Sequence, residues 1–302
     1  MNRDGHLERR HLSIRQLLCT LCIGVSLPIF AAIATSQASA LSLSELGRYV
    51  SVNVVSPAVG GPVHVDVYLP PGYPHLGVRY PVLYLLHGEP GSGPQMASSL
   101  RLNTVVSALI DSRQIKPMLI VLPTDGPTVR TDTEWMNSVT DPKAQWGTFI
   151  TSDLVSFVDR HYAVCESRTA TSIGGVSMGA FGAVNAALDH LGSFGAVLSW
   201  SGYFVANTPK VNGSEGSASW RAASPLYSLA KFIPQLKKTP LRISFYIGPA
   251  DHFASENIAF SRLLTRDHLP YRFALDKGPH GYVLWRKYFD SELIWLSSAE
   301  RC

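Results

Sequence analysis

Residues 174–182 read GGVSMGAFG, and this stretch decides the fold that we expect for the chain. It contains the pattern Gly-x-Ser-x-Gly with Ser177 at its centre, between an expected strand at Thr169–Ile173 and a helical pattern at Met178–His190. A sharp strand-to-helix turn lifts a serine hydroxyl above the sheet, and the flanking glycines permit this turn because a Cβ there would collide with neighbouring backbone. We therefore predict that Ser177 is a nucleophile at a helix N-terminus, where free N–H groups favour developing negative charge.

Strands and helices alternate along the rest of the chain. Val63–Leu69 alternates apolar and polar residues, as a half-buried strand near a sheet edge does, whereas Pro81–Leu86 and Met118–Leu122 are continuous apolar runs typical of strands covered on both faces. This alternation predicts one α/β domain over residues 41–302, with a mostly parallel sheet flanked by helices. Asn212–Ser219 is expected to be a surface loop. The remaining expected strands are Ala196–Trp200, Arg242–Ile247 and Tyr271–Leu275, and the remaining expected helices are Thr104–Ser112, Phe149–Arg160, Ser255–Thr265 and Leu284–Leu296.

Composition excludes several classes of protein. Hydrophobic residues make up 46% of the 302 and charged residues only 16%, which excludes disorder over most of the chain and also a coiled coil. The net charge of +4 falls to +2 without the four basic and two acidic residues of the first 40 positions. No basic stripe remains, so we expect no nucleic-acid partner.

The N-terminus has the order of an export signal. Met1–Arg15 is polar with a positive excess, Leu17–Ala34 is almost wholly apolar, and Ala38–Ala40 offers a small-x-small cleavage site. We expect residues 1–40 to be a signal peptide and the mature protein to be secreted or held in the cell envelope. A retained membrane anchor is the alternative, because the 18 apolar residues reach the lower end of a spanning length. Arg9-Arg10 leaves both general and twin-arginine export open.

Four cysteines divide into two pairs. Cys19 and Cys22 lie within the apolar signal segment and are expected to leave with it. Cys165 and Cys302 remain, and an even pair in an oxidising compartment is a disulfide candidate. Two unpaired thiols are the alternative, because the sequence does not give the Cα separation that a disulfide requires.

A second glycine-rich stretch, LLHGEPGSG at residues 85–93, follows the expected strand Pro81–Leu86. In an α/β-hydrolase fold this loop supplies one backbone N–H of an oxyanion hole, and the residue after the nucleophile supplies the other. We predict that these are the N–H groups of Glu89 and Met178, since Pro90 has none to donate. His87 precedes the nucleophile, whereas the base comes last in this fold, so we expect His87 to shape the loop.

The acid and the base are expected in the last third of the chain. Asp251 follows the strand Arg242–Ile247, and His280 follows the next strand and precedes the last helix. Ser177, Asp251 and His280 thus occur in the order serine, acid, histidine that this fold requires. Asp276 is the main competitor for the acid and Glu256 a weaker one.

No cofactor and no catalytic metal are expected. The chain has no Gly-Lys-Ser/Thr phosphate loop and no His-Glu-x-x-His. His252 is a tempting alternative base, but it lies on the same loop as the predicted acid.

Several segments together resemble one known group of proteins, the esterase D / antigen 85-type esterases of the α/β-hydrolase superfamily. The likeness covers roughly Val63 to Leu296. It lies in residues 174–183 around the serine, in Phe194–Val197 and Ser199–Gly202, in Gly278–Tyr282 followed by Trp285-Arg286, and in Trp146–Leu154, which is similar to a helix start in the mycolyltransferases of the group.

The resemblance implies serine-dependent hydrolysis of a carboxylic ester, or acyl transfer, through an acyl-enzyme and without a cofactor. Its implied substrate is a small-molecule, lipid or sugar ester, and membrane contact is expected only through an uncleaved signal segment. His87 stands where the mycolyltransferases carry an aspartate, and their trehalose-facing segment is not recognisable in Glu89–Ser99. Both departures argue against transferring that activity. An acyltransferase and a non-catalytic wall-associated module stay open, and a peptidase is disfavoured.

Overall fold

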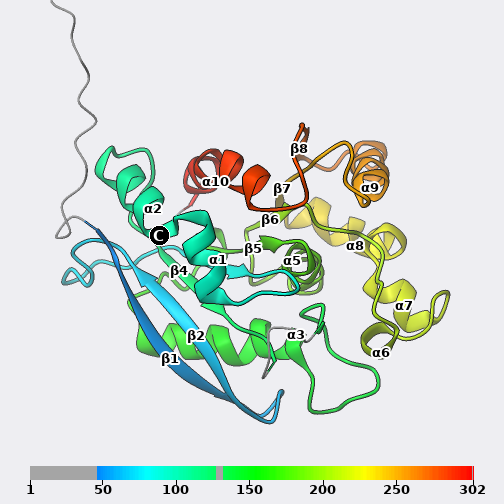
Figure 1. The fold of residues 1–302 in the computed structure, drawn as a ribbon, viewed down its shortest axis with the longest axis horizontal. Helices are drawn as coiled ribbons and strands as arrows, with labels where there is room; N and C mark the ends of the chain where they lie inside the picture. The colour runs from blue at the N-terminus through cyan, green and yellow to red at the C-terminus, as the bar shows by residue number, and fades with distance from the viewer. Residues whose placement is uncertain (1–45, 127–131, 301) are drawn as a thin grey trace, which may run out of the picture. The chain divides into compact units, whose positions relative to one another are not determined.

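One mixed sheet forms the centre of the chain. The structure is a computed structural model that describes residues 46–126, 132–300 and 302. The strands in these residues are β1 (Arg48–Ser56), β2 (Gly61–Leu69), β3 (Val82–Leu86), β4 (Leu119–Pro123), β5 (Thr171–Val176), β6 (Ala196–Trp200), β7 (Arg242–Ile247) and β8 (Tyr271–Leu275). They lie in the order β1-β2-β4-β3-β5-β6-β7-β8 (Figure 1). The pairs β1–β2 and β2–β4 are antiparallel and the others are parallel, which confirms the expected mostly parallel sheet.

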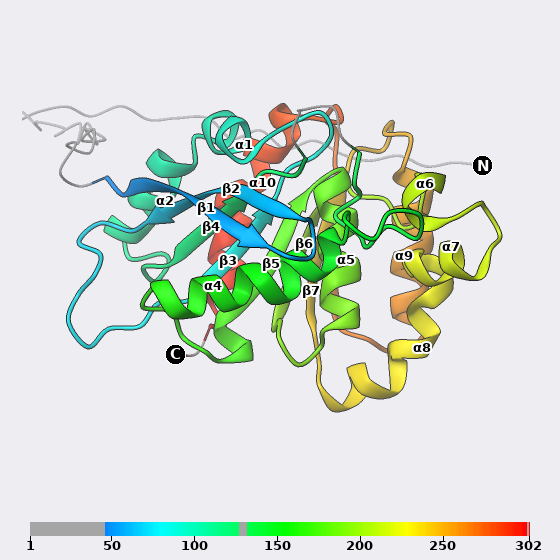
Figure 2. The ribbon, with the colours of Figure 1, turned by 90° about the horizontal axis from the view of Figure 1, so that it is seen from below.

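Helices cover both faces of this sheet. The longer ones are α1 (Gly93–Leu100), α2 (Leu102–Asp111), α4 (Leu154–His161), α5 (Met178–Asp189), α8 (Pro225–Lys238), α9 (Ala254–Arg266) and α10 (Tyr282–Ser297). Figure 2 shows α4 and α5 in front of the sheet, with α1, α2 and α10 behind it. The buried side chains of α8 and α9 join the core on the α4–α5 side.

The central strands explain why both faces must be covered. Side chains alternate between the two faces along a strand. In β3, Tyr84 and Leu86 pack into the core under α4 and α5, whereas Leu83 and Leu85 pack into the core under α1, α2 and α10. All four are fully buried. The continuous apolar runs in the sequence therefore correctly predicted both β3 and β4.

The structure adds elements to the expected set. β1 pairs along its whole length with β2. α1 begins at Gly93 and is capped by Ser92, whose Oγ accepts a hydrogen bond from the Gln95 N–H at 3.3 Å. α8 starts with Pro225, a residue suited to a first helical turn.

The loop expected over Asn212–Ser219 is shorter in the structure, because both ends of this stretch are helical, so the expected bounds are wrong. α6 (Pro209–Asn212) ends in this stretch and α7 (Ala218–Ala223) begins in it, because Ser217 accepts a hydrogen bond from the Trp220 N–H.

The expected signal peptide, residues 1–40, lies outside the described residues, so its removal stays a prediction. Within the described part of the chain, no helix combines the length and apolar character needed to cross a bilayer.

The structure places Cys165 and Cys302 in disulfide geometry, with their Cα atoms 5.5 Å apart. That separation lies inside the range that a disulfide requires. Cys165 is buried, and its N–H donates to the Tyr80 carbonyl at 2.9 Å, so one end of the link is fixed beside β3. The geometry favours a link between Cys302 and the body of the domain.

Candidate active site

Ser177 occupies a sharp turn between β5 and α5. Its backbone has φ 53° and ψ −119°, a left-handed conformation that costs energy for any residue with a side chain. The Ser177 N–H donates to the Trp200 carbonyl at 2.9 Å and so ties the turn to β6. A Cβ on Gly175 would lie 2.5 Å from the Leu86 carbonyl oxygen, and a Cβ on Gly179 would collide with the same oxygen. These contacts explain why glycine stands two residues before and two after the serine.

The structure brings together Ser177, His280 and Asp251, the three residues predicted for catalysis. His280 Nε2 lies 2.9 Å from Ser177 Oγ, and His280 Nδ1 lies 2.7 Å from Asp251 Oδ2. Asp251 and His280 follow β7 and β8 respectively, and Ser177 follows β5. Parallel strands end at one edge of a sheet, so residues 74 and 103 positions from the serine meet above it.

The Asp251 carboxylate is arranged to stay ionised. Its side chain is fully buried, and burial raises its pKa. Hydrogen bonds from His280 and from the Phe253 N–H, together with the charges of His280 and His252, outweigh burial and hold the pKa of Asp251 below its usual value. An ionised carboxylate at Nδ1 fixes the ring tautomer and stabilises an imidazolium.

The competing acids have other partners. Asp276 pairs with Lys287 and accepts a hydrogen bond from the Tyr288 hydroxyl at 2.8 Å. Glu256 accepts hydrogen bonds from the N–H groups of Phe204 and Val205 at 2.7 and 3.0 Å. Neither carboxylate contacts His280, so the geometry favours Asp251 as the acid.

Trp285 holds the histidine ring from the side. Its indole makes an edge contact with the His280 ring, with centroids 5.6 Å apart, and its Nε1–H donates to Ser201 Oγ at 3.0 Å. This tryptophan belongs to the histidine segment that carries the family resemblance. The contact explains why a tryptophan occurs in that segment, because a packed ring with a fixed hydrogen bond limits the rotation of the neighbouring His280 ring.

The loop after β3 lies against the serine, as an oxyanion hole requires. A Cβ on Gly88 would lie 3.0 Å from Ser177 Cβ, so the backbone of this loop approaches the nucleophile closely. Met178 is the first residue of α5, and the first N–H groups of a helix have no intrahelical acceptor. Glu89 lines the same cavity as Ser177, and Met178 directly follows it in the chain. Their role as oxyanion donors stays a prediction.

His87 lies beneath this loop and has no contact with Ser177. It is fully buried, its Nε2 lies 3.1 Å from Asp125 Oδ1, and its Nδ1 lies 2.9 Å from the Gly88 carbonyl. Its own carbonyl accepts a hydrogen bond from Trp135 Nε1–H at 3.0 Å. These contacts agree with the expected loop-shaping role.

Glu134 is a buried acid that the sequence did not reveal. Its carboxylate accepts hydrogen bonds from the Tyr203 hydroxyl at 2.9 Å, from the Asn207 N–H at 3.1 Å and from the Asn212 side chain. Burial raises its pKa to about 7. Glu134 thus ties the segment before α3 (Trp146–Thr148) to the loop after β6. The Tyr203 ring in turn packs against that of Phe253 at a tilt, with centroids 4.8 Å apart, beside the acid loop.

A cavity of about 220 Å³ opens beside Ser177. Its lining includes Glu89 and Pro90 from the loop after β3, and Tyr282 and Trp285 from α10. Burial raises the pKa of Glu89, and the charges of Asp125 and Asp132 raise it further. A larger cavity of about 590 Å³ lies between β1, β2 and the α1–α2 corner, and its lining does not include Ser177, Asp251 or His280.

Residues 56–296 match the protein family described as "Putative esterase". The chain belongs to this esterase family. The family assignment confirms the resemblance that the serine and histidine segments indicated.

Curated and solved relatives agree with the family. Esterase Rv1288 of Mycobacterium tuberculosis (strain ATCC 25618 / H37Rv) is 31% identical over 145 residues, which are 48% of this chain and 30% of that protein. The chain thus spans less than a third of that relative's length. A ferulic acid esterase superposes with a TM-score of 0.74 at 23% identity, over 84% of this chain and 98% of the other. FphF, a fluorophosphonate-binding serine hydrolase of Staphylococcus aureus, superposes with a TM-score of 0.69 at 20% identity, over 83% and 98%. These structures confirm the α/β-hydrolase fold.

Proposed function

We propose that this esterase-family protein is an exported serine hydrolase that cleaves carboxylic esters through a covalent acyl-enzyme. One observation carries the proposal: His280 lies within hydrogen-bond distance of both Ser177 Oγ and Asp251 Oδ2, at 2.9 and 2.7 Å. A serine whose hydroxyl meets a histidine that is oriented by a buried carboxylate is the arrangement that activates the oxygen for attack.

In the first half of the reaction, His280 Nε2 takes the proton of Ser177 as Oγ attacks the ester carbonyl. The oxyanion that forms is held by the N–H groups of Glu89 and Met178, each worth about 3 kcal/mol. Collapse of this intermediate breaks the bond to the alcohol, and the alcohol leaves with the proton from His280. The acyl group is then bonded to Ser177.

In the second half, water takes the place of the alcohol. His280 Nε2 accepts its proton, the hydroxide attacks the acyl carbonyl, and the proton returns to Ser177 as the acid leaves. Asp251 stays ionised throughout and stabilises the imidazolium. Its lowered pKa supports this role.

The cavity beside Ser177 favours a short acyl group. Pockets for drug-sized ligands occupy roughly 300–1,000 Å³, and this one holds about 220 Å³. Pro90 and Trp285 line it, so a longer chain would have to leave the cavity or displace fixed side chains.

We expect kcat/KM for aryl esters to fall as the acyl chain grows from acetyl to dodecanoyl, by about tenfold or more once the chain exceeds the cavity. A series of p-nitrophenyl esters measures this, with the Ser177→Ala variant giving the uncatalysed background. Trehalose added as an acceptor distinguishes transfer from hydrolysis, because transfer would produce a sugar ester. Dodecanoyl esters as the best substrates would contradict the short-acyl proposal. No Ser177-dependent turnover of any ester would favour the non-catalytic module.

We also propose that the protein is exported, with Leu41 at or near its mature N-terminus and Cys165 bridged to Cys302. The small-x-small site at Ala38–Ala40 and the 5.5 Å Cα separation of the two cysteines support this. Mass spectrometry of protein recovered outside the cytoplasm tests both parts in one digest without reductant. We expect a terminal peptide that starts at Leu41 and a linked pair of cysteine peptides.

An intact Met1 terminus in a membrane fraction would contradict the removal of residues 1–40. Two alkylatable thiols in unreduced protein would contradict the disulfide.

A further inference from the structure

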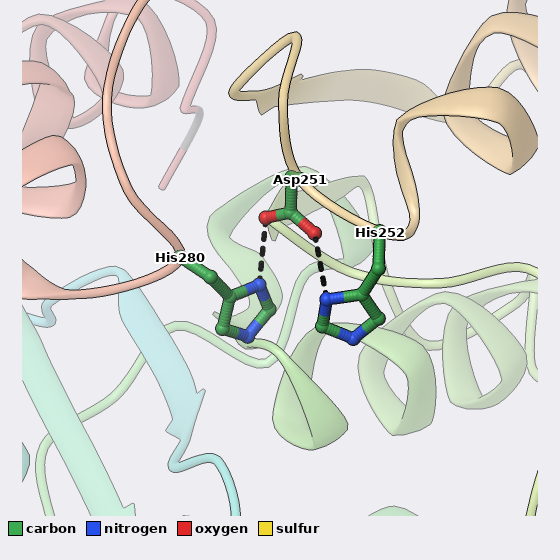
Figure 3. A group of neighbouring side chains, drawn as sticks. All are labelled: Asp251, His252 and His280. Atoms are coloured by element: carbon green, nitrogen blue, oxygen red, sulfur yellow. Dashed lines mark hydrogen bonds and ion pairs between the residues drawn. The ribbon is translucent and has the colours of Figure 1, made fainter.

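A second histidine, His252, lies close to the Asp251 carboxylate oxygen that does not face His280. In Figure 3 the Asp251 carboxylate stands between two imidazole rings, and each ring turns a nitrogen toward it. Oδ2 lies 2.7 Å from His280 Nδ1, and Oδ1 lies 3.5 Å from His252 Nδ1. The reaction steps above do not use His252.

The spacing of these side chains fits one small metal ion. One ligand atom from each of Asp251, His252 and His280 can be chosen so that all lie within 4.8 Å of one another. Ligand atoms at about 2.1 Å from a tetrahedral zinc ion lie about 3.4 Å apart. Asp251 Oδ1 and His252 Nδ1 are 3.5 Å apart, whereas His280 Nδ1 lies 2.7 Å from the other oxygen, Oδ2. Two imidazoles on such an ion have ring centroids about 5 Å apart, and these rings are 5.4 Å apart.

Access and ligand chemistry also fit zinc. The His252 side chain is 68% exposed and that of His280 is 26% exposed, so an ion can reach both rings from solvent and keep water as its fourth ligand. Two imidazoles and a carboxylate form a donor set that suits Zn²⁺. Three protein ligands with one open position are usual where zinc is accessible.

We propose that Asp251, His252 and His280 form a Zn²⁺ site, and that the ion bound there reversibly inhibits the enzyme. The binding part stands on this geometry alone, whereas the inhibition part rests on the proposed function. Among the described residues, this is the one group of three or more histidine, cysteine, aspartate or glutamate side chains close enough to share an ion.

Inhibition follows from the tautomer of His280. In the free enzyme Nδ1 carries the proton toward Asp251, and Nε2 presents its lone pair to Ser177. Zinc takes the Nδ1 lone pair, so the proton that Nδ1 held moves to Nε2 through solvent, and no proton is gained or lost by the ring. Nε2 then cannot accept the proton of Ser177. The serine stays a neutral alcohol until the ion leaves.

Calorimetric titration of the purified protein with ZnCl₂ tests the binding part. We expect His252→Gln to weaken Zn²⁺ binding by about tenfold or more, because glutamine removes the imidazole ligand. His161→Gln, at an exposed histidine outside the group, is the matched control and should bind as the wild type does. Ser177→Ala should also retain the site, which separates binding from catalysis. Equal affinity in wild type and His252→Gln, or no saturable binding by the wild type, would overturn the site.

Ester hydrolysis measured against Zn²⁺ concentration tests the inhibition part. Wild type should lose activity as zinc binds and regain it with a chelator, and His252→Gln should need about tenfold more zinc for half-inhibition. Each variant is compared with its own rate without metal. Zinc that binds at the site without slowing turnover would contradict the inhibition part and leave the site standing. If no ester is hydrolysed, the proposed function fails, while the titration still decides the site.

Discussion

Ser177→Ala is expected to lower the rate of ester hydrolysis by about 10⁴ or more. The reason is covalent: alanine has no oxygen to attack the carbonyl, and His280 Nε2, 2.9 Å away in the wild type, has no proton to take. The fall should appear in kcat and in kcat/KM, because the lost interaction exists only along the reaction. Steady-state kinetics on the best ester of the chain-length series measures it.

The matched control is Ser98→Ala, at an exposed serine of α1, which should keep wild-type rates. Thermal unfolding of both variants separates lost chemistry from lost fold, since alanine fits the Ser177 turn about as well as serine does. Undiminished hydrolysis by a folded Ser177→Ala protein would remove this serine from the mechanism.

Asp251→Asn is expected to lower kcat by about 10⁴ with little change in KM. An amide at this position can donate to Nδ1, and it then favours the tautomer whose proton sits on Nε2. Nε2 is the atom that faces Ser177, so the base loses its lone pair where it is needed. Because Asp251 does not line the cavity beside Ser177, ground-state binding of the substrate should be nearly unchanged.

Asp276→Asn is the comparison that makes this result specific. Asp276 is four residues before His280, but it pairs with Lys287 and Tyr288 on α10 and has no contact with the ring. Its loss should leave kcat close to the wild-type value. A large fall in kcat for Asp276→Asn, together with a nearly unchanged kcat for Asp251→Asn, would make Asp276 the acid. The roles of Ser177 and His280 would be unaffected.

The parts of the fold that the sequence predicted are those specified by local pattern. The turn around Ser177 is one, because only glycine fits two residues away on either side. The buried strands β3 and β4 are others, since their continuous apolar runs need cover on both faces. β1 was missed although Val50, Val52 and Val54 alternate with polar residues. The same period-2 pattern that indicated β2 was present there, so β1 was predictable in principle.

The parts that could not be predicted depend on contacts between distant residues. His87 pairs with Asp125, 38 positions away, and nothing local to either residue indicates the other. Glu134 meets Tyr203 only because β6 brings the following loop over the segment before α3. For the proposed catalytic acid, the sequence offered both Asp251 and Asp276 after consecutive strands. The structure favours Asp251, because its loop brings the carboxylate to His280 Nδ1 and the loop of Asp276 turns that carboxylate to α10.

Labelling with a fluorophosphonate, followed by mass spectrometry of the digested protein, tests the central claim most directly. The reagent forms a covalent bond with an activated serine oxygen, so it reports the pairing of Ser177 with His280 without any assumption about the substrate. We predict one adduct per chain, on Ser177, and none in Ser177→Ala. An adduct on another serine, such as Ser92 or Ser201, or no adduct on folded wild-type protein, would contradict the account.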